Sequence, residues 1–134
     1  MMSDSEFKGY KKLAALVVAK QIEEWDNTVN SLYFNQREVK KKVKDGNKYE
    51  IDDCMCRLRS RLLQLDRLSG FFVGDRMILY SEACGFPDGT VILSEREKKH
   101  KELLKWAVTE VKKYFGYVYS EKELENVDCQ DKRS

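Results

Sequence analysis

The chain has 134 residues, enough for one domain, and 36% of them are charged, well above the roughly 25% usual in globular proteins. A single proline and seven glycines exclude collagen-like, mucin-like and proline-rich chains and favour long helices. The 25 lysines and arginines nearly balance the 23 aspartates and glutamates. This balance excludes a protein that binds nucleic acid over its whole surface, but it does not exclude local basic segments.

The termini and cysteines bear on the compartment. The acidic start of the chain does not resemble a basic signal peptide, and the apolar run at 13–19 has only seven residues, far short of the ~20 that span a bilayer. Without a secretory signal, cysteines in a short chain are expected to stay reduced. We therefore expect a cytoplasmic protein that does not associate with membranes and has four free thiols, at Cys54, Cys56, Cys84 and Cys129.

The first predicted element is a helix over Ser5–Val43, in which apolar residues recur at three- and four-residue steps. Ser3 or the serine at 5 can cap its start. Asn27 and Asn35 allow a break within it, and the turn signal around Gly46 ends it.

The clearest helix is predicted over 49–68. Its apolar stripe follows a three/four period through Ile51, Met55, Leu58, Leu62 and Leu65. Arg57 and Arg61 border this stripe on one edge and Arg59 on the other. Ser69-Gly70 is the predicted end.

Residues 71–89 allow two interpretations, because short apolar runs do not distinguish strand from helix. Residues 72–80 can form a strand that pairs with 90–93, or a short helix can be capped by Asp75 and end at Gly85.

A last helix is predicted from Thr90 or Ser94 to Gly116, with a capping box at Ser94 in the second case. Beyond it, residues 120–123 are predicted to start one more turn, and 128–134 to be frayed.

Three short blocks stand out, at Tyr10–Ala19, Phe71–Arg76 and Asp88–Leu93. Together they resemble small accessory proteins of phages and prophages of Gram-positive bacteria. Gly74 stands where that family has a serine, and Arg76 where it has an aromatic residue. The resemblance implies an all-helical fold and a phage context, in which many small non-enzymatic proteins block host machinery, and it carries no catalytic activity.

We therefore predict an all-α fold, a compact bundle of four to five helices in a single domain spanning 1–134. A short β-hairpin around 71–94 is the alternative for that segment.

Catalytic apparatus is not evident in the sequence. His100, the single histidine, lies in a polar run with no adjacent nucleophile and is predicted to be a solvated surface residue. Cys54 and Cys56 are one residue apart, which on a helix turns their side chains about 200° from each other and disfavours zinc. No glycine-rich phosphate loop is present. We expect no enzyme activity, no cofactor and no metal.

Two basic segments, at 37–44 and 57–67, can contact an anionic partner. Tyr33, Phe34 and Tyr49 lie near them and can stack on bases. The aromatic run at 114–119 exceeds what one helical face can bury, and tyrosine and arginine concentrate at interfaces. The predicted partner-binding residues are Lys40, Lys41, Lys42, Arg57, Arg59, Arg61, Arg67, Tyr117 and Tyr119.

The first functional hypothesis is a non-enzymatic, phage-encoded inhibitor in the host cytoplasm that occludes a host defence protein, in the manner of an anti-CRISPR, or a nuclease. Its partner would be a host protein or a protein–nucleic-acid complex. The alternative is a small DNA- or RNA-binding regulatory protein that uses segments 37–44 and 57–67. A structural subunit that acts as a homodimer or larger homo-oligomer is the third interpretation.

Overall fold

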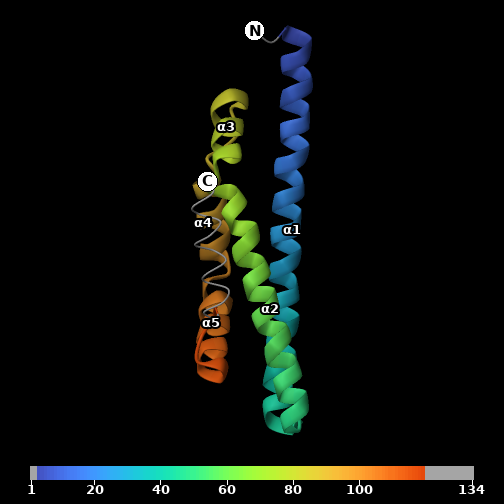
Figure 1. Cartoon of the computed structure of the whole chain (residues 1–134), viewed down its shortest axis with the longest axis vertical. Helices are drawn as coiled ribbons and strands as arrows, with labels where there is room; N and C mark the ends of the chain where they lie inside the picture. The colour runs from blue at the N-terminus through green and yellow to red at the C-terminus, as the bar shows by residue number, and fades with distance from the viewer. Residues whose placement is uncertain (1–2, 120–134) are drawn as a thin grey trace.

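The computed structural model describes residues 3–119, and within them the chain forms five α-helices and no strand (Figure 1). In chain order they are α1 (Asp4–Asp45), α2 (Lys48–Phe72), α3 (Asp75–Cys84), α4 (Gly89–Lys99) and α5 (Lys101–Phe115). The predicted all-α bundle is confirmed, and the hairpin alternative around 71–94 is wrong. The predictions for 120–123 and 128–134 lie outside the described residues.

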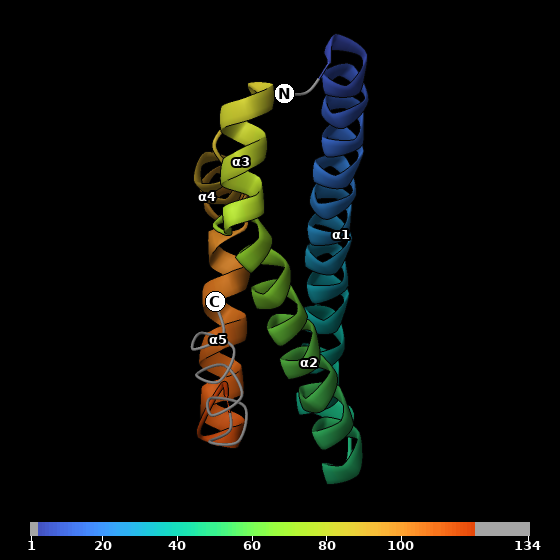
Figure 2. The same ribbon diagram turned by 45° about the horizontal axis from the view of Figure 1, so that its top comes forward.

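The helices form a bundle of three columns, shown in Figures 1 and 2. The 42 residues of α1 make a rod of about 63 Å at a rise of 1.5 Å per residue. After a tight turn, α2 runs back antiparallel to α1, and α3 continues upward beside the N-terminal half of α1. The chain then reverses, and α4 and α5 descend against α2.

The first helix is continuous, so the break that Asn27 and Asn35 allow does not occur. The apolar stripe of α1 continues through this region and packs on α2, and such packing outweighs the weak helix propensity of asparagine. Of the two serines suggested as caps, Ser3 is the one used: its hydroxyl accepts from the backbone N–H of Glu6 at 3.2 Å. The predicted stop is confirmed at Gly46.

The second helix has a full capping box. The Asn47 side chain accepts from the Glu50 N–H at 2.8 Å, and the Glu50 carboxylate accepts from the Asn47 N–H at 3.5 Å. The end predicted at Ser69-Gly70 is wrong, since the helix continues to Phe72. Ser69 is compatible with the helix because its hydroxyl donates to the carbonyl of Leu65 at 2.8 Å.

The third helix confirms the helical interpretation of this segment. It begins at Asp75 and ends before Gly85, whose φ of 74° is in the left-handed region that favours glycine. The cap predicted at Asp75 is wrong, because the N-cap is Gly74 and Asp75 is the first residue inside the helix.

The last predicted helix is in fact two. The first of them, α4, begins at Gly89, and its cap is Asp88, whose carboxylate accepts from the N–H of Thr90 at 2.8 Å. The alternative start at Ser94 is therefore wrong. The helix breaks at His100, and α5 then ends before Gly116 as predicted.

The core follows the apolar faces of α1 and α2 and is closed by the shorter helices. Trp25, which is 0% exposed, is its largest member. The other large, fully buried side chains are Phe72, Leu32, Leu58, Met77, Val29, Val39 and Val111.

The prediction that His100 is a solvated surface residue is wrong. The ring is partly buried at the junction of α4 and α5, where its Nδ1 lies 2.8 Å from the hydroxyl of Tyr33 on α1. Burial lowers the pKa of His100, and the nearby charges of Lys99 and Arg96 lower it further, against the opposing effect of Asp26. In the tautomer whose Nδ1 carries no proton, the neutral ring accepts a hydrogen bond from the Tyr33 hydroxyl. Burial therefore favours the neutral ring in the folded protein.

We predict that this histidine makes stability depend on pH. Because its pKa is lower in the folded state than the ordinary value of about 6.5, the unfolded chain binds more protons between the two values, and stability falls with falling pH through this window. The contribution of the neutral His100 to folding stability is fully present above about pH 6.5. Urea unfolding between pH 5 and pH 7 measures it. His100→Gln should flatten the dependence, and an unchanged slope in that variant would contradict the assignment.

Glycine substitutions provide a second test of the packing. A Cβ on Gly89 would lie 1.9 Å from the carbonyl oxygen of Phe72 and 2.7 Å from Met77 Cγ, whereas a Cβ on Gly9 meets nothing within 4 Å. Gly89→Ala should therefore destabilise the fold by about 3 kcal/mol or more. Gly9→Ala should stabilise it by about 0.5–1 kcal/mol. Urea unfolding of both variants checks this, and equal stabilities would refute the close contact between α4 and the end of α2.

Candidate functional site

The four predicted arginines do not form one surface. Arg57 and Arg61 line a groove between α1 and α2, whereas Arg59 lies on the opposite edge of α2, toward the end of the chain. This split confirms the edges predicted from helical spacing. Arg67 is exposed near the C-terminal end of α2 and is not among the residues that line this groove.

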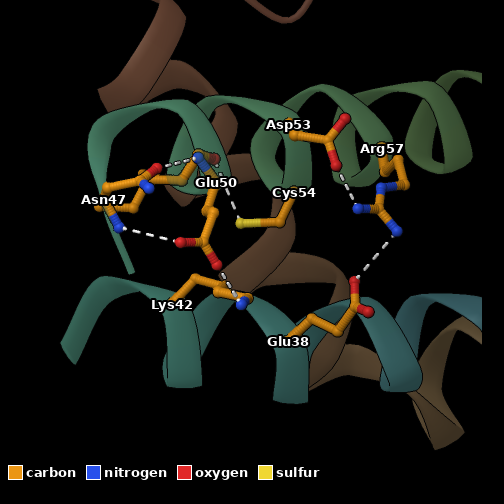
Figure 3. Close-up of polar contacts among 8 residues, drawn as sticks. Glu38, Lys42, Asn47, Glu50, Asp53, Cys54 and Arg57 are labelled. Carbon is orange, nitrogen blue, oxygen red and sulfur yellow. Dashed lines mark hydrogen bonds and ion pairs between the residues drawn. The ribbon is translucent and has the colours of Figure 1, made fainter. Parts of the chain in front are cut away.

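Two of the predicted cations are ion-paired within the α1–α2 hairpin (Figure 3). Arg57 pairs with Asp53 and lies 3.5 Å from a carboxylate oxygen of Glu38, and the Asp53 bond and charge raise its pKa. Lys42 pairs with Glu50, which raises the pKa of Lys42 and lowers that of the carboxylate. The neighbouring carboxylates therefore offset much of the positive charge of Arg57 and Lys42 within the folded chain itself.

Arg59 fastens the segment after α5, residues 116–119, to α2. Its Nε donates to the carbonyl of Val118 at 2.9 Å. The guanidinium lies 5.9 Å from the Phe115 ring centroid and 5.3 Å from that of Tyr117. These are intramolecular contacts of the kind that hold a chain end in place. The geometry gives Arg59 and Tyr117 a structural role.

The other tyrosines near this segment make similar contacts. The Tyr119 hydroxyl donates to Asp66, and that of Tyr114 donates to Asp52 at 3.0 Å, which raises the pKa of Tyr114. Both bonds tie the end of the described chain to α2. Tyr119 is only partly exposed as a result.

Four exposed cations near the C-terminal end of α1 have no ion pair among the described residues. We call them the basic row; its members are Arg37, Lys40, Lys41 and Lys44. They occupy one side of the last two turns because they are three or four residues apart. The Lys40 ammonium lies 5.9 Å from the ring centroid of Trp106 on α5.

The row continues toward the N-terminus through Phe34 and Asn30, since positions 30, 34, 37, 41 and 44 alternate steps of four and three. Phe34 is 53% exposed, an unusual placement for a phenylalanine in the middle of a packed helix. An exposed aromatic ring thus lies one turn before the first cation of the row.

Phe34 and Asn30 also border the groove that Arg57 and Arg61 line. We call this the polar groove: a hollow of about 500 Å³ lined by Asn30, Ser31, Phe34, Asn35, Arg57, Ser60 and Arg61. Asn35 is buried there, and its side-chain oxygen has no hydrogen-bond partner. The sequence indicated Phe34 and both arginines, but only the packing of α1 on α2 reveals the role of Asn35.

The potential metal ligands and the thiols of the described part of the chain do not gather into one cluster. No group of three or more histidine, cysteine, aspartate or glutamate side chains there could hold a metal ion. Cys54 is buried and its thiol donates to the carbonyl of Ile51 at 3.2 Å, whereas Cys56 is exposed, so the two diverge as predicted. Burial raises the pKa of Cys54, which disfavours the reactive thiolate. Among the described helices, none has the length and apolar character that crossing a membrane requires.

Comparison with known proteins finds no family model that matches the chain, and no curated protein or solved structure that matches it significantly. The resemblance to phage accessory proteins therefore stays a prediction.

We predict that Arg59 contributes to stability and that Arg67 does not. Arg59→Ala loses a charged hydrogen bond and two aromatic contacts, so it should destabilise the fold by about 1–2 kcal/mol. Arg67→Ala, an exposed change on the same helix, should stay within about 0.5 kcal/mol of the unmodified protein. Thermal unfolding compares the two. Equal melting temperatures would contradict the structural role of Arg59.

Proposed function

We propose that this chain is a non-enzymatic binding protein that holds a single-stranded nucleic acid along the basic row. The observation that carries the proposal is the set of four exposed cations, unpaired within the described residues, on one side of α1. Exposed Phe34 lies at one end of the set, and Trp106 lies beside Lys40. Lysine and arginine attract phosphates, and aromatic faces stack on bases of any sequence.

The dimensions of the row suit a flexible strand. Arg37 and Lys44 are seven residues apart, which is about 10 Å along the helix axis. The row is short, so we expect moderate affinity at low salt and a steep loss as salt rises. Four phosphate contacts on a single strand predict a slope of about −3 in log affinity against log salt, or about 50-fold between 50 and 200 mM.

The second candidate is the phage-encoded inhibitor that occludes an acidic surface of a host defence protein or nuclease. Its support is the exposed apolar surface at the turn between α1 and α2, where Val43 is exposed and Tyr49 is 81% exposed. Tyrosine is enriched at protein interfaces, and the apolar side chain of Val43 does not bind the phosphates of a nucleic acid. Affinity purification from a bacterial host lysate, with and without nuclease, separates the two candidates. One stoichiometric protein that survives nuclease would favour the inhibitor.

Charge reversal tests the proposed nucleic-acid function. The triple variant Arg37→Glu, Lys41→Glu, Lys44→Glu should weaken binding of a labelled ten-nucleotide oligouridine at least tenfold and flatten its salt dependence. The binding is measured by fluorescence anisotropy at 50 and 200 mM salt.

The matched control is Lys8→Glu, Lys11→Glu, Lys12→Glu, at the opposite end of the same helix. These lysines are also exposed and have no ion pair among the described residues, so the control carries the same change in net charge. It should retain most of the affinity. Equal losses in both variants would show a response to total charge alone and would contradict a site on the basic row.

A further inference from the structure

The polar groove is electrostatically different from the basic row beside it. Arg57, on one wall, is offset by Asp53 and by Glu38. Arg61 donates to the neutral side chain of Gln64 at 3.0 Å and has no ion pair among the described residues. A phosphate would therefore meet much less positive charge in the groove than along the row. A neutral, planar ligand with several hydrogen-bonding groups suits the groove better.

Asn35 supplies the observation that points to such a ligand. It is only 5% exposed, lines the groove, and leaves its side-chain oxygen without a donor. Buried carboxamides are rarely left unsatisfied, because they lose water without gaining a partner. Rotation about the last side-chain bond exchanges the oxygen and nitrogen of the amide. As placed in the structure, the oxygen is shielded from solvent, so Asn35 offers it to a ligand in the groove only in a rotated conformation of its side chain.

Phe34 connects the groove to the basic row. Its ring lines the groove and is 53% exposed, and Arg37 and Lys41 follow it at three and seven residues on the same face of α1. A strand whose phosphates lie on the row would therefore bring a base to the Phe34 ring.

We infer that the polar groove receives one unstacked base of the bound strand and that it prefers guanine. This inference rests on the proposed nucleic-acid function and names the part of the ligand that the groove recognises. Guanine presents amino and imino donors to the Asn35 oxygen on one edge, and on another the O6 and N7 acceptors that arginine binds most often. Its flat face packs against Phe34. Arg61 is the arginine available for this contact.

The experiment compares oligouridine of ten nucleotides with the same oligonucleotide carrying one central guanine, by fluorescence anisotropy at 50 mM salt. The unmodified protein should bind the guanine-containing strand about tenfold more tightly. Phe34→Ala should weaken binding of both strands about tenfold. Its control, Leu16→Ala, removes another exposed apolar side chain of α1, 65% exposed, and should change neither affinity.

Two further variants address guanine recognition itself. Arg61→Gln should abolish the preference for the guanine-containing strand, whereas Arg67→Gln, with the same loss of charge on the same helix, should keep it. Asn35→Leu should also abolish the preference. It should raise the melting temperature, because an apolar side chain of similar volume replaces a buried amide whose oxygen has no hydrogen-bond partner. Retention of the preference in Arg61→Gln and Asn35→Leu would overturn the inference.

The outcomes separate the two proposals. If oligouridine binds and depends on the basic row, but Phe34→Ala behaves like Leu16→Ala, the groove inference fails and the proposed function stands. If neither strand binds at 50 mM salt, both fail. If the unmodified protein binds the two strands equally, guanine recognition is refuted.

Discussion

The burial of Trp25 is the constraint on which the rest of this structure depends. Its indole is fully buried in the middle of α1, and its N–H donates to the hydroxyl of Ser69 on α2 at 3.0 Å. The same indole borders a hollow with Leu104 of α5, and its centroid lies 6.2 Å from that of His100. One side chain thus lies against each column of the bundle, and its N–H donor favours the arrangement of the first two helices in which Ser69 lies beside it.

That arrangement sets the register of the α1–α2 hairpin. Moving from Trp25 toward the turn, the next pairs across the interface are Glu38 with Arg57 and Lys42 with Glu50. This antiparallel register places Phe34 and Asn35 across the polar groove from Arg61. The groove is therefore a consequence of the packing that buries Trp25.

Two groups of cations then differ, those held by an intramolecular partner and those of the basic row. Lys42 and Arg57 meet carboxylates within the hairpin, Arg59 holds residues 116–119, and Arg96 lies 3.1 Å from Asp26 between α4 and α1. The cations of the basic row have no such partner among the described residues. A chain of nearly neutral net charge can in this way present a local positive surface, and local placement matters more than net charge for binding phosphates.

The sequence predicts most of this fold because helix periodicity and glycine stops are local signals. Gly46, Gly85 and Gly116 end helices where their positions suggested. The failures arise from contacts between distant residues: packing of α1 on α2 carries the helix past Asn27, and Tyr33 buries a histidine 67 positions away.

The same limit applies to the candidate site. The spacing of Arg37, Lys41 and Lys44 is visible in the sequence. The neutralisation of Arg57 by Glu38, 19 residues earlier, and the unsatisfied oxygen of Asn35 are not, because they depend on which residues the hairpin register brings together. Sequence alone therefore overestimates the available positive charge of α2.

The central claim is that a single strand lies along α1 from Phe34 to Lys44, and photocrosslinking tests it most directly. A ten-nucleotide oligonucleotide containing 5-iodouridine, which crosslinks to aromatic side chains on irradiation, is bound to the full chain at low salt, and the crosslinked peptides are identified by mass spectrometry. A strand bound there should crosslink to Phe34 and Trp106, both of which flank the basic row. Crosslinks confined to aromatic residues at the far end of α1, such as Phe7 and Tyr10, would contradict it.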